Sequence, residues 1–381
     1  MATMYRYQLP VEHTGWKLNG ETQTAFTWEY EDEREKLLAL YDKGKQQQWD
    51  AATRIDWSLE LDPENPQEID DRLIPIYGSP LWDKMGDKDK IMLRQHQQAQ
   101  SLSQFIHGEQ GALMAAARIV QMAPDLDAKF YAATQVMDEA RHVEAYARLL
   151  NEKLGIAYPI TPGLKSLLET VMTDRRWDMT YLGMQILIEG LALAAFQRIR
   201  DYARNRLAAS VNAYVMQDEA RHVAFGRLAL RDFYPQLTDA ERREREDFVV
   251  EACYQMRDRF NQRELWEHLG LPVESAVDAA MNSRTCGCSA SACSAASCRP
   301  SKTSDCGAQG CKRRSSTWAR SSLPTSTAKP CSSRISVSLS SSMRGSSCAR
   351  RSLDRLTATA NAVGAERNRE KAQKTSTTKT D

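Results

Sequence analysis

The six-residue sequence DEARHV occurs twice in the chain, at residues 138–143 and 218–223. Each copy places a glutamate and a histidine three positions apart: Glu139 with His142, and Glu219 with His222. Residues at positions i and i+3 lie on the same helix face, so each pair presents a carboxylate and an imidazole to one point. Such a pair can bind a divalent metal ion.

A lone glutamate precedes each copy by 30 residues, because Glu109 lies before Glu139 and Glu189 lies before Glu219. Thirty residues are enough to descend one helix, turn, and return to the same height. One such motif is often only a charged helix face. Its repetition at an offset of 80 residues instead predicts two antiparallel helix pairs whose four carboxylates and two imidazoles surround one point.

This set of side chains suits two divalent ions, and its oxygen-rich composition favours iron or manganese over zinc. Glu109 and Glu189 lie in apolar helices of small residues, where an unpaired charge costs several kcal/mol. Two metal ions would compensate that cost. Four further residues are predicted to surround the ligands, the aspartates orienting the imidazoles and the arginines offsetting acidic charge: Asp138, Asp218, Arg141 and Arg221.

From Asp87 onward the sequence predicts long helices, and these helices must position the site. Proline and glycine punctuation and caps predict their ends. The expected helices are about Asp87–Met122, Asp125–Leu154, Leu164–Arg204 (two helices or one kinked helix), Leu207–Tyr234, and Thr238 to about Gly270. No alternating strand pattern is visible. The expected fold is therefore all-α.

The chain divides into three expected parts: an irregular N-terminal segment (1–86), the helical body (87–284) and a low-complexity tail (285–381). The tail carries 17 Lys/Arg and 5 Asp/Glu, whereas the preceding residues carry 34 and 45. It is interpreted as a disordered Ser/Arg-rich segment or as the product of a frameshift. A zinc site is the third alternative, although its cysteines form no Cys-x-x-Cys pair: Cys286, Cys288, Cys293 and Cys298.

Composition also bounds the compartment and the partners. The acidic body argues against nucleic acid as a partner, because phosphate binding needs a basic face. The first 20 residues lack the apolar stretch of a signal peptide. The apolar run from Tyr181 to Gln197 is too short for a membrane span. Since only Cys253 lies before residue 285, we expect a reduced, cytoplasmic protein.

At these residues the sequence resembles the ferritin-like di-iron-carboxylate superfamily, over about residues 87–235. Within it, the chain looks most like the oxygen-activating branch, which includes the hydroxylase subunits of bacterial di-iron monooxygenases and the ribonucleotide reductase small subunit. The doubled Asp-Glu-x-Arg-His is similar to the monooxygenase hydroxylases. The resemblance implies a ferritin-like four-helix bundle core with extra helices. It also implies six metal ligands, namely Glu109, Glu139, His142, Glu189, Glu219 and His222, with Asp138 and Asp218 supporting them.

Three positions depart from relatives within this superfamily. Leu193 stands where the monooxygenases carry a threonine, and Val215 stands where aryl-amine N-oxygenases carry an extra histidine ligand. Tyr146 stands where the reductase subunit holds its radical tyrosine, and the equivalent residue in the second repeat is Gly226. Tyr146 is therefore interpreted either as a packing residue or as a redox residue.

The leading functional hypothesis is an oxygenase or oxidase that uses two irons and dioxygen to oxidise or hydroxylate a small organic substrate. A ferredoxin or reductase would donate electrons, and a homodimer is expected. The alternatives are a radical-generating reductase-like subunit and an iron-oxidising protein without an organic substrate. Four glycines near the ligands would either open a substrate pocket or only allow close helix packing: Gly108, Gly111, Gly190 and Gly226.

Overall fold

The computed structural model describes residues 7–9, 15–30 and 34–283. Within these residues the regular structure is helical, apart from one isolated parallel bridge between Tyr7 and Ala157. The all-α prediction is therefore confirmed. The tail at 285–381 lies outside the described residues, so its interpretation stays a prediction.

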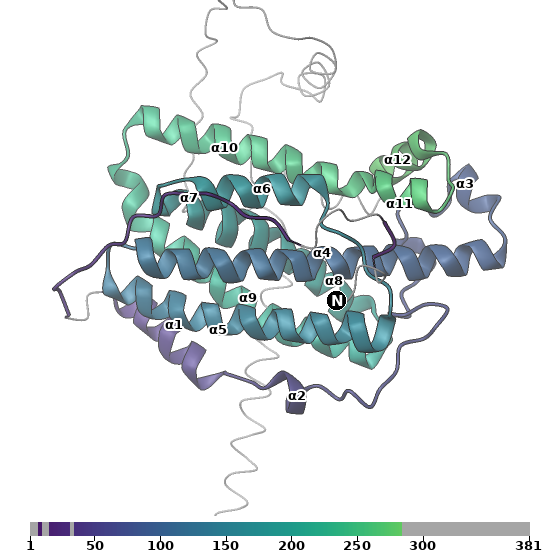
Figure 1. Cartoon of the computed structure of the whole chain (residues 1–381), viewed down its shortest axis with the longest axis horizontal. Coiled ribbons are helices and arrows are strands. Elements are labelled where there is room, and N and C mark those ends of the chain that lie inside the picture. Colours follow the sequence, from purple (N-terminus) through teal and green to yellow (C-terminus); the bar gives the residue numbers. More distant parts are fainter. Residues whose placement is uncertain (1–6, 10–14, 31–33, 284–381) are drawn as a thin grey trace, which may run out of the picture. The chain divides into compact units, whose positions relative to one another are not determined.

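Four long elements form the core of the fold (Figure 1). Helix α4 (Asp87–Met122) packs along α5 (Leu126–Arg148), and α8 (Glu189–Tyr202) packs along α9 (Arg206–Phe233). Helices α5 and α9 also contact one another. The two predicted helix pairs thus meet as a four-helix bundle, which confirms the ferritin-like core.

Local chemistry explains the bounds of these helices. Asp125 caps α5 by accepting a hydrogen bond from the Ala128 amide, and Asn205 caps α9 in the same way. Beyond α5 the helix continues as a π-helical turn, Leu149–Leu154, and ends where Gly155 adopts a φ of +71°. A left-handed residue at this position favours glycine.

The stretch predicted at Leu164–Arg204 forms two helices, which was one of the two interpretations of the sequence. Helix α6 (Pro162–Thr173) ends before Asp174, and a second helix starts with α7 (Trp177–Tyr181). The second helix passes through a π-helical segment, η4 (Leu182–Ile188), directly into Glu189 at the start of α8. Insertions of π-helix are rare and concentrate at functional sites.

Helix α10 (Asp239–Asp258) covers η4 together with α6. Its predicted capping box is present, with Thr238 and Glu241 bonding each other's backbone amides. The predicted end near Gly270 was wrong. The chain leaves the helix through a 3-10 turn, η6 (Arg259–Asn261), and a left-handed Gln262 at φ +46°. Two short helices follow, α11 (Arg263–His268) and α12 (Val273–Asn282).

The N-terminal segment is only partly irregular. Sequence analysis missed α1 (Glu35–Gln46), which packs against both α5 and α9. Shorter helical turns follow in α2 (Ala51–Arg54), η2 (Asp71–Leu73) and α3 (Pro80–Asp83). Residues just after α1, Gln48 and Trp49, contact side chains of α5 and α9 in the buried cluster described below.

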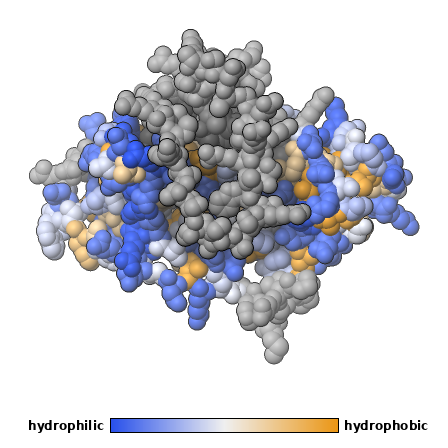
Figure 2. Space-filling model, turned by 90° about the horizontal axis from the view of Figure 1, so that it is seen from above, coloured by the Kyte–Doolittle hydropathy of each residue, from blue (hydrophilic) through white to orange (hydrophobic). Residues whose placement is uncertain are grey.

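One helical stretch of the described residues, Trp177–Tyr202, is long and apolar enough to cross a membrane by length and composition alone. Its most apolar window is 61% buried inside the fold, as is also typical of a core helix in a bundle. On the face seen in Figure 2, hydrophilic residues are interspersed with apolar ones.

Candidate metal centre

Each helix of the core contributes to one buried cluster. Glu109 comes from α4, Glu189 begins α8, and the two Glu-x-x-His pairs come from α5 and α9. The structure therefore brings together all six predicted ligands, and none is more than 5% exposed: Glu109, Glu139, His142, Glu189, Glu219 and His222. Whether each one ligates a metal remains a proposal.

The potential ligand atoms fall into two overlapping groups. The first contains Glu109, Glu139, His142 and Glu219, and the second contains Glu139, Glu189, Glu219 and His222. Within each group, one ligand atom per residue lies within 4.8 Å of the others. Glu139 and Glu219 belong to both groups, so each has a carboxylate oxygen close to both sets of potential ligand atoms.

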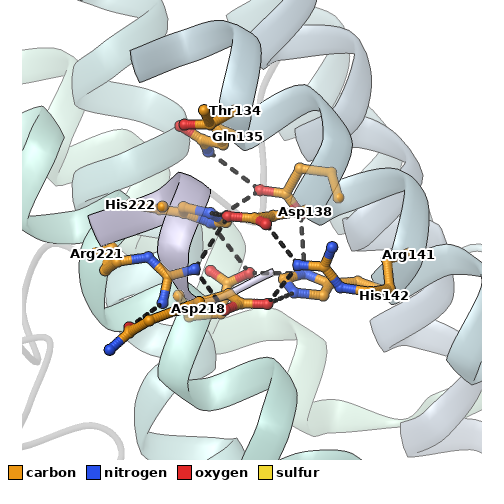
Figure 3. A network of polar contacts seen from close by, with 12 residues as sticks. Thr134, Gln135, Asp138, Arg141, His142, Asp218, Arg221 and His222 are labelled. Carbon is orange, nitrogen blue, oxygen red and sulfur yellow. Dashed lines mark hydrogen bonds and ion pairs between the residues drawn. The ribbon is translucent and has the colours of Figure 1, made fainter. Parts of the chain in front are cut away.

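Each imidazole contacts the aspartate of the other repeat. His142 Nε2 lies 3.1 Å from Asp218 Oδ2, and His222 Nε2 lies 3.2 Å from Asp138 Oδ2 (Figure 3). A proton held at Nε2 by the aspartate leaves the lone pair at Nδ1. Nδ1 of His142 is 3.1 Å from Glu109 Oε2, so it faces the carboxylates.

Two arginines neutralise the two aspartates. Arg141 and Arg221 each contact both Asp138 and Asp218, and none of the four is more than 6% exposed (Figure 3). The predicted surrounding residues therefore form one closed network with two charges of each sign. Because this network balances itself, the four glutamates of the centre are left to be neutralised by something else, such as two divalent cations.

The N-terminal segment completes the network, which sequence analysis did not predict. Trp49 Nε1 donates to Asp218 Oδ2 at 2.7 Å, and Gln48 Nε2 donates to Asp138 Oδ1 at 2.8 Å. Arg141 also donates to Gln48 Oε1 at 2.6 Å and lies over the Trp49 ring. The only sequence signal was the polar stretch that directly follows α1.

Several buried polar atoms of the cluster make no hydrogen bond in the described structure, among them Glu189 Oε2, both carboxylate oxygens of Glu219, and His222 Nδ1. Their near neighbours include other members of the cluster, since His222 Nδ1 lies 3.1 Å from Glu139 Oε1 and Glu219 Oε1 lies 3.3 Å from His142 Nδ1. Polar atoms buried without a hydrogen bond are costly, so they require an explanation. Coordination to a metal would satisfy all of them. The donor set of carboxylate oxygens with two imidazole nitrogens fits iron or manganese.

The pKa shifts of the clustered residues also indicate that positive charge is needed at the centre. Burial raises the pKa of Glu109 and of Glu189 well above the ordinary value, and the neighbouring Glu219 raises both further. Burial alone would lower the pKa of His142, yet the carboxylates around it, Glu109 first, raise it well above the ordinary value. Protons therefore hold the metal-free cluster together, and metal ions must displace them on binding.

The four glycines divide between the two interpretations. A Cβ atom on Gly111 would lie 2.5 Å from Leu168 Cδ2, and one on Gly226 would lie 2.6 Å from Gln185 Cβ, so both permit close packing. A Cβ on Gly108 would meet nothing within 4 Å, and one on Gly190 only a carbonyl oxygen at 4.0 Å. Close packing therefore accounts for Gly111 and Gly226, whereas no packing neighbour requires glycine at Gly108 or Gly190.

Tyr146 and Val215 lie together in an apolar cluster with Leu102 and Phe196, all buried. Val215 offers no ligand atom, so the candidate set remains at six residues. The Tyr146 hydroxyl donates to Asn212 Oδ1 at 2.9 Å. Burial raises the pKa of Tyr146 well above its ordinary value, and the carboxylates of Glu109 and Glu219 contribute.

A family model described as p-aminobenzoate N-oxygenase AurF matches residues 30–295 of the chain. The comparison with curated proteins gives no match. Among solved structures, the chain is similar to two mutants of an R2-like ligand-binding oxidase with anaerobically reconstituted Mn/Fe cofactor. One is 19% identical, covering 67% of this chain and 90% of that chain, with a TM-score of 0.41. The other is 18% identical, covering 68% and 89%, with a TM-score of 0.40.

Proposed function

Because the chain belongs to the p-aminobenzoate N-oxygenase AurF family, we propose that its six clustered residues hold two iron ions for the oxidation of an organic substrate by dioxygen. The family match establishes the class of enzyme, a di-iron oxidoreductase that activates dioxygen. The proposal assigns the ligands. The observation that carries it is the sharing of Glu139 and Glu219 by both four-residue groups.

The residues of the chain would bind the two ions and orient the ligands. The bridging positions of Glu139 and Glu219 would hold two ions side by side, while Glu109 with His142 and Glu189 with His222 complete one position each. Asp138 and Asp218 hold the imidazole protons at Nε2, and burial of the ligands excludes water. Ferrous ions, when bound, supply electrons and open coordination positions for dioxygen.

An aromatic amine is the substrate class we propose, on the strength of the family's described activity on p-aminobenzoate. Aromatic side chains near Glu109 support an aromatic ring in that position. Phe105, one turn before Glu109 on α4, lies 5.8 Å from Tyr146 and 4.9 Å from Phe196 between ring centroids. Such edges and faces favour a further ring.

We expect iron-loaded, reduced protein to consume dioxygen faster with p-aminobenzoate than with benzoate, and to produce an N-oxygenated product. Benzoate keeps the ring and carboxylate but lacks the nitrogen that would be oxidised. An oxygen electrode and mass spectrometry of the products test this. Oxygen uptake that is independent of any organic compound, with only ferric iron accumulating, would instead support the iron-oxidising alternative.

A radical role for Tyr146 is the second candidate, supported by its burial near the carboxylates of Glu109 and Glu219. We expect a packing role instead, because its hydroxyl donates to a neutral amide oxygen, a weak proton acceptor. Tyr146→Phe should then cost about 1 kcal/mol of unfolding free energy and leave oxygen consumption unchanged. A tyrosyl radical signal in paramagnetic resonance that disappears in Tyr146→Phe, but persists in Tyr158→Phe, would reverse this assignment.

The remaining partners are proposed on sequence grounds. A ferredoxin or reductase would return the centre to the ferrous state after each turnover. A homodimer and a cytoplasmic location are proposed as well. The location is supported by the single cysteine before residue 285, Cys253.

A further inference from the structure

The two halves of the centre repeat at an offset of 80 residues, yet their surroundings differ at three equivalent pairs of positions. These pairs are Phe105 and Gln185, Val215 and Gln135, and Tyr146 and Gly226. The glutamines and the glycine belong to the half that contains Glu189 and His222, whereas Phe105, Val215 and Tyr146 belong to the half of Glu109 and His142. One ion position is thus flanked by amides and the other by apolar and aromatic groups.

Gln135 lies one turn before Glu139 on α5 and is fully buried. Its Nε2 donates to Glu189 Oε1 at 2.9 Å and to Glu139 Oε1 at 3.1 Å. One side chain therefore ties a terminal carboxylate to a bridging one. Hydrogen bonds from an amide to an ionised carboxylate are among the stronger ones in proteins, more so in a dry interior.

Gln185 fixes the direction in which the Gln135 amide points. Gln185 Nε2 donates to Gln135 Oε1 at 3.4 Å, so the oxygen of Gln135 faces Gln185 and its nitrogen faces the carboxylates. Gln185 itself lies on the π-helical segment η4, fully buried, against the bare backbone of Gly226. Of the two interpretations of Gly226, the structure supports close packing, because the aliphatic part of the Gln185 side chain occupies the space next to it.

Within residues 34–283, the half of the centre that contains Glu109 has no such pair of amides. Among the described residues, the hydrogen-bond partner of the Glu109 carboxylate is His142 Nδ1, which is also the nitrogen that faces the metal position. If that nitrogen binds a metal ion, Glu109 keeps no hydrogen-bond donor in the described part of the chain. Val215, at the position equivalent to Gln135, is a buried apolar residue.

We propose that Gln135, held by Gln185, is a positioning residue that fixes the Glu189 carboxylate and makes the ion position of Glu189 and His222 the tighter of the two. The position of Glu109 and His142 is the weaker and more adaptable one. This inference rests on the proposed ligand set. Its physical basis is that an outer partner which orients a ligand carboxylate changes metal affinity by about 10–100-fold.

Titration of the metal-free protein with Mn²⁺, with free ion measured by paramagnetic resonance, tests the proposal without any turnover. The wild type should bind two ions in two steps of different affinity. Gln135→Met keeps the side-chain length but lacks the donor, and should weaken the tighter step by about 10–100-fold. The weaker step should change less, because Gln135 contacts that position only through the shared Glu139. Gln185→Leu should produce a smaller shift in the same direction.

Matched variants separate this role from general packing. Val215→Ala changes the equivalent position of the other repeat and should leave the tighter step unchanged, and thermal unfolding of each metal-free variant monitors folding. The Glu109→Ala variant should retain only the ion position of Glu189. In that variant, Gln135→Met should lower the affinity for the single remaining ion. If Gln135→Met weakens both steps equally, or neither, the positioning role is wrong. A wild type that binds fewer than two ions would instead overturn the ligand set itself.

Discussion

Replacing Glu139 and Glu219 together by alanine is expected to leave the protein unable to bind either metal ion. Each carboxylate belongs to both groups of potential ligands, so the double substitution leaves only one carboxylate and one imidazole at each position. Two protein ligands are too few to bind these ions tightly. Metal analysis after reconstitution with ferrous iron should fall from about two ions per chain to none.

Single substitutions of the glutamates that belong to only one group of potential ligands test each ion position separately. Glu109→Ala and Glu189→Ala each remove a residue of one group only, so each variant should retain one ion. Glu144→Ala, an exposed glutamate on the same helix as Glu139, should retain both. Two ions retained in the Glu139→Ala, Glu219→Ala variant, or zinc bound in preference to iron in the wild type, would contradict the di-iron assignment.

The ligand cluster could be predicted because helical geometry is local and regular. A spacing of three residues places Glu139 and His142 on one face, and 30 residues bring Glu109 back to the same height. No tertiary information was needed for either step. The identical spacing in the second repeat then required the same geometry, and the two helix pairs meet in the structure as expected.

The parts that could not be predicted depend on contacts between distant segments. Gln48 and Trp49 reach Asp138 and Asp218 across 90 and 169 residues of sequence, and no local pattern specifies such contacts. Gly226 left two interpretations open, because an absent side chain indicates open space only if no neighbour fills it. Here Gln185 fills it, from a π-helical segment that periodicity could not reveal.

The arginine–aspartate network has consequences for stability as well as for the metal ions. Asp218 accepts hydrogen bonds from His142 Nε2, Trp49 Nε1, Arg141 and Arg221, and it is 1% exposed. Asp218→Ala would leave two buried guanidinium groups with one carboxylate between them. Breaking a buried ion pair from one side costs about 3–5 kcal/mol, because the remaining charge stays buried and uncompensated.

The sign of the pH dependence follows from the state of Asp218. Burial would raise its pKa, but the hydrogen bond from His142 and the neighbouring positive charges lower it well below the ordinary value. A carboxylate whose pKa is lower in the folded state stabilises the fold above its unfolded pKa of about 3.9 and loses that contribution as the pH falls below it. The difference between wild type and Asp218→Ala should therefore be full at neutral pH and shrink in acid.

Urea unfolding of the metal-free proteins at neutral pH measures this effect, and we expect Asp218→Ala to lose about 3–5 kcal/mol of unfolding free energy. Glu152→Ala removes an exposed pair with Arg148 and should cost only about 0.3–0.5 kcal/mol. Asp218→Asn keeps the shape and an acceptor for Trp49 but loses the charge, so it should fall between them. A loss in Asp218→Ala as small as that of Glu152→Ala would show that Asp138 alone neutralises both arginines. His142 would then keep its orientation through the remaining contacts, and the two aspartates would not be equivalent partners of the centre.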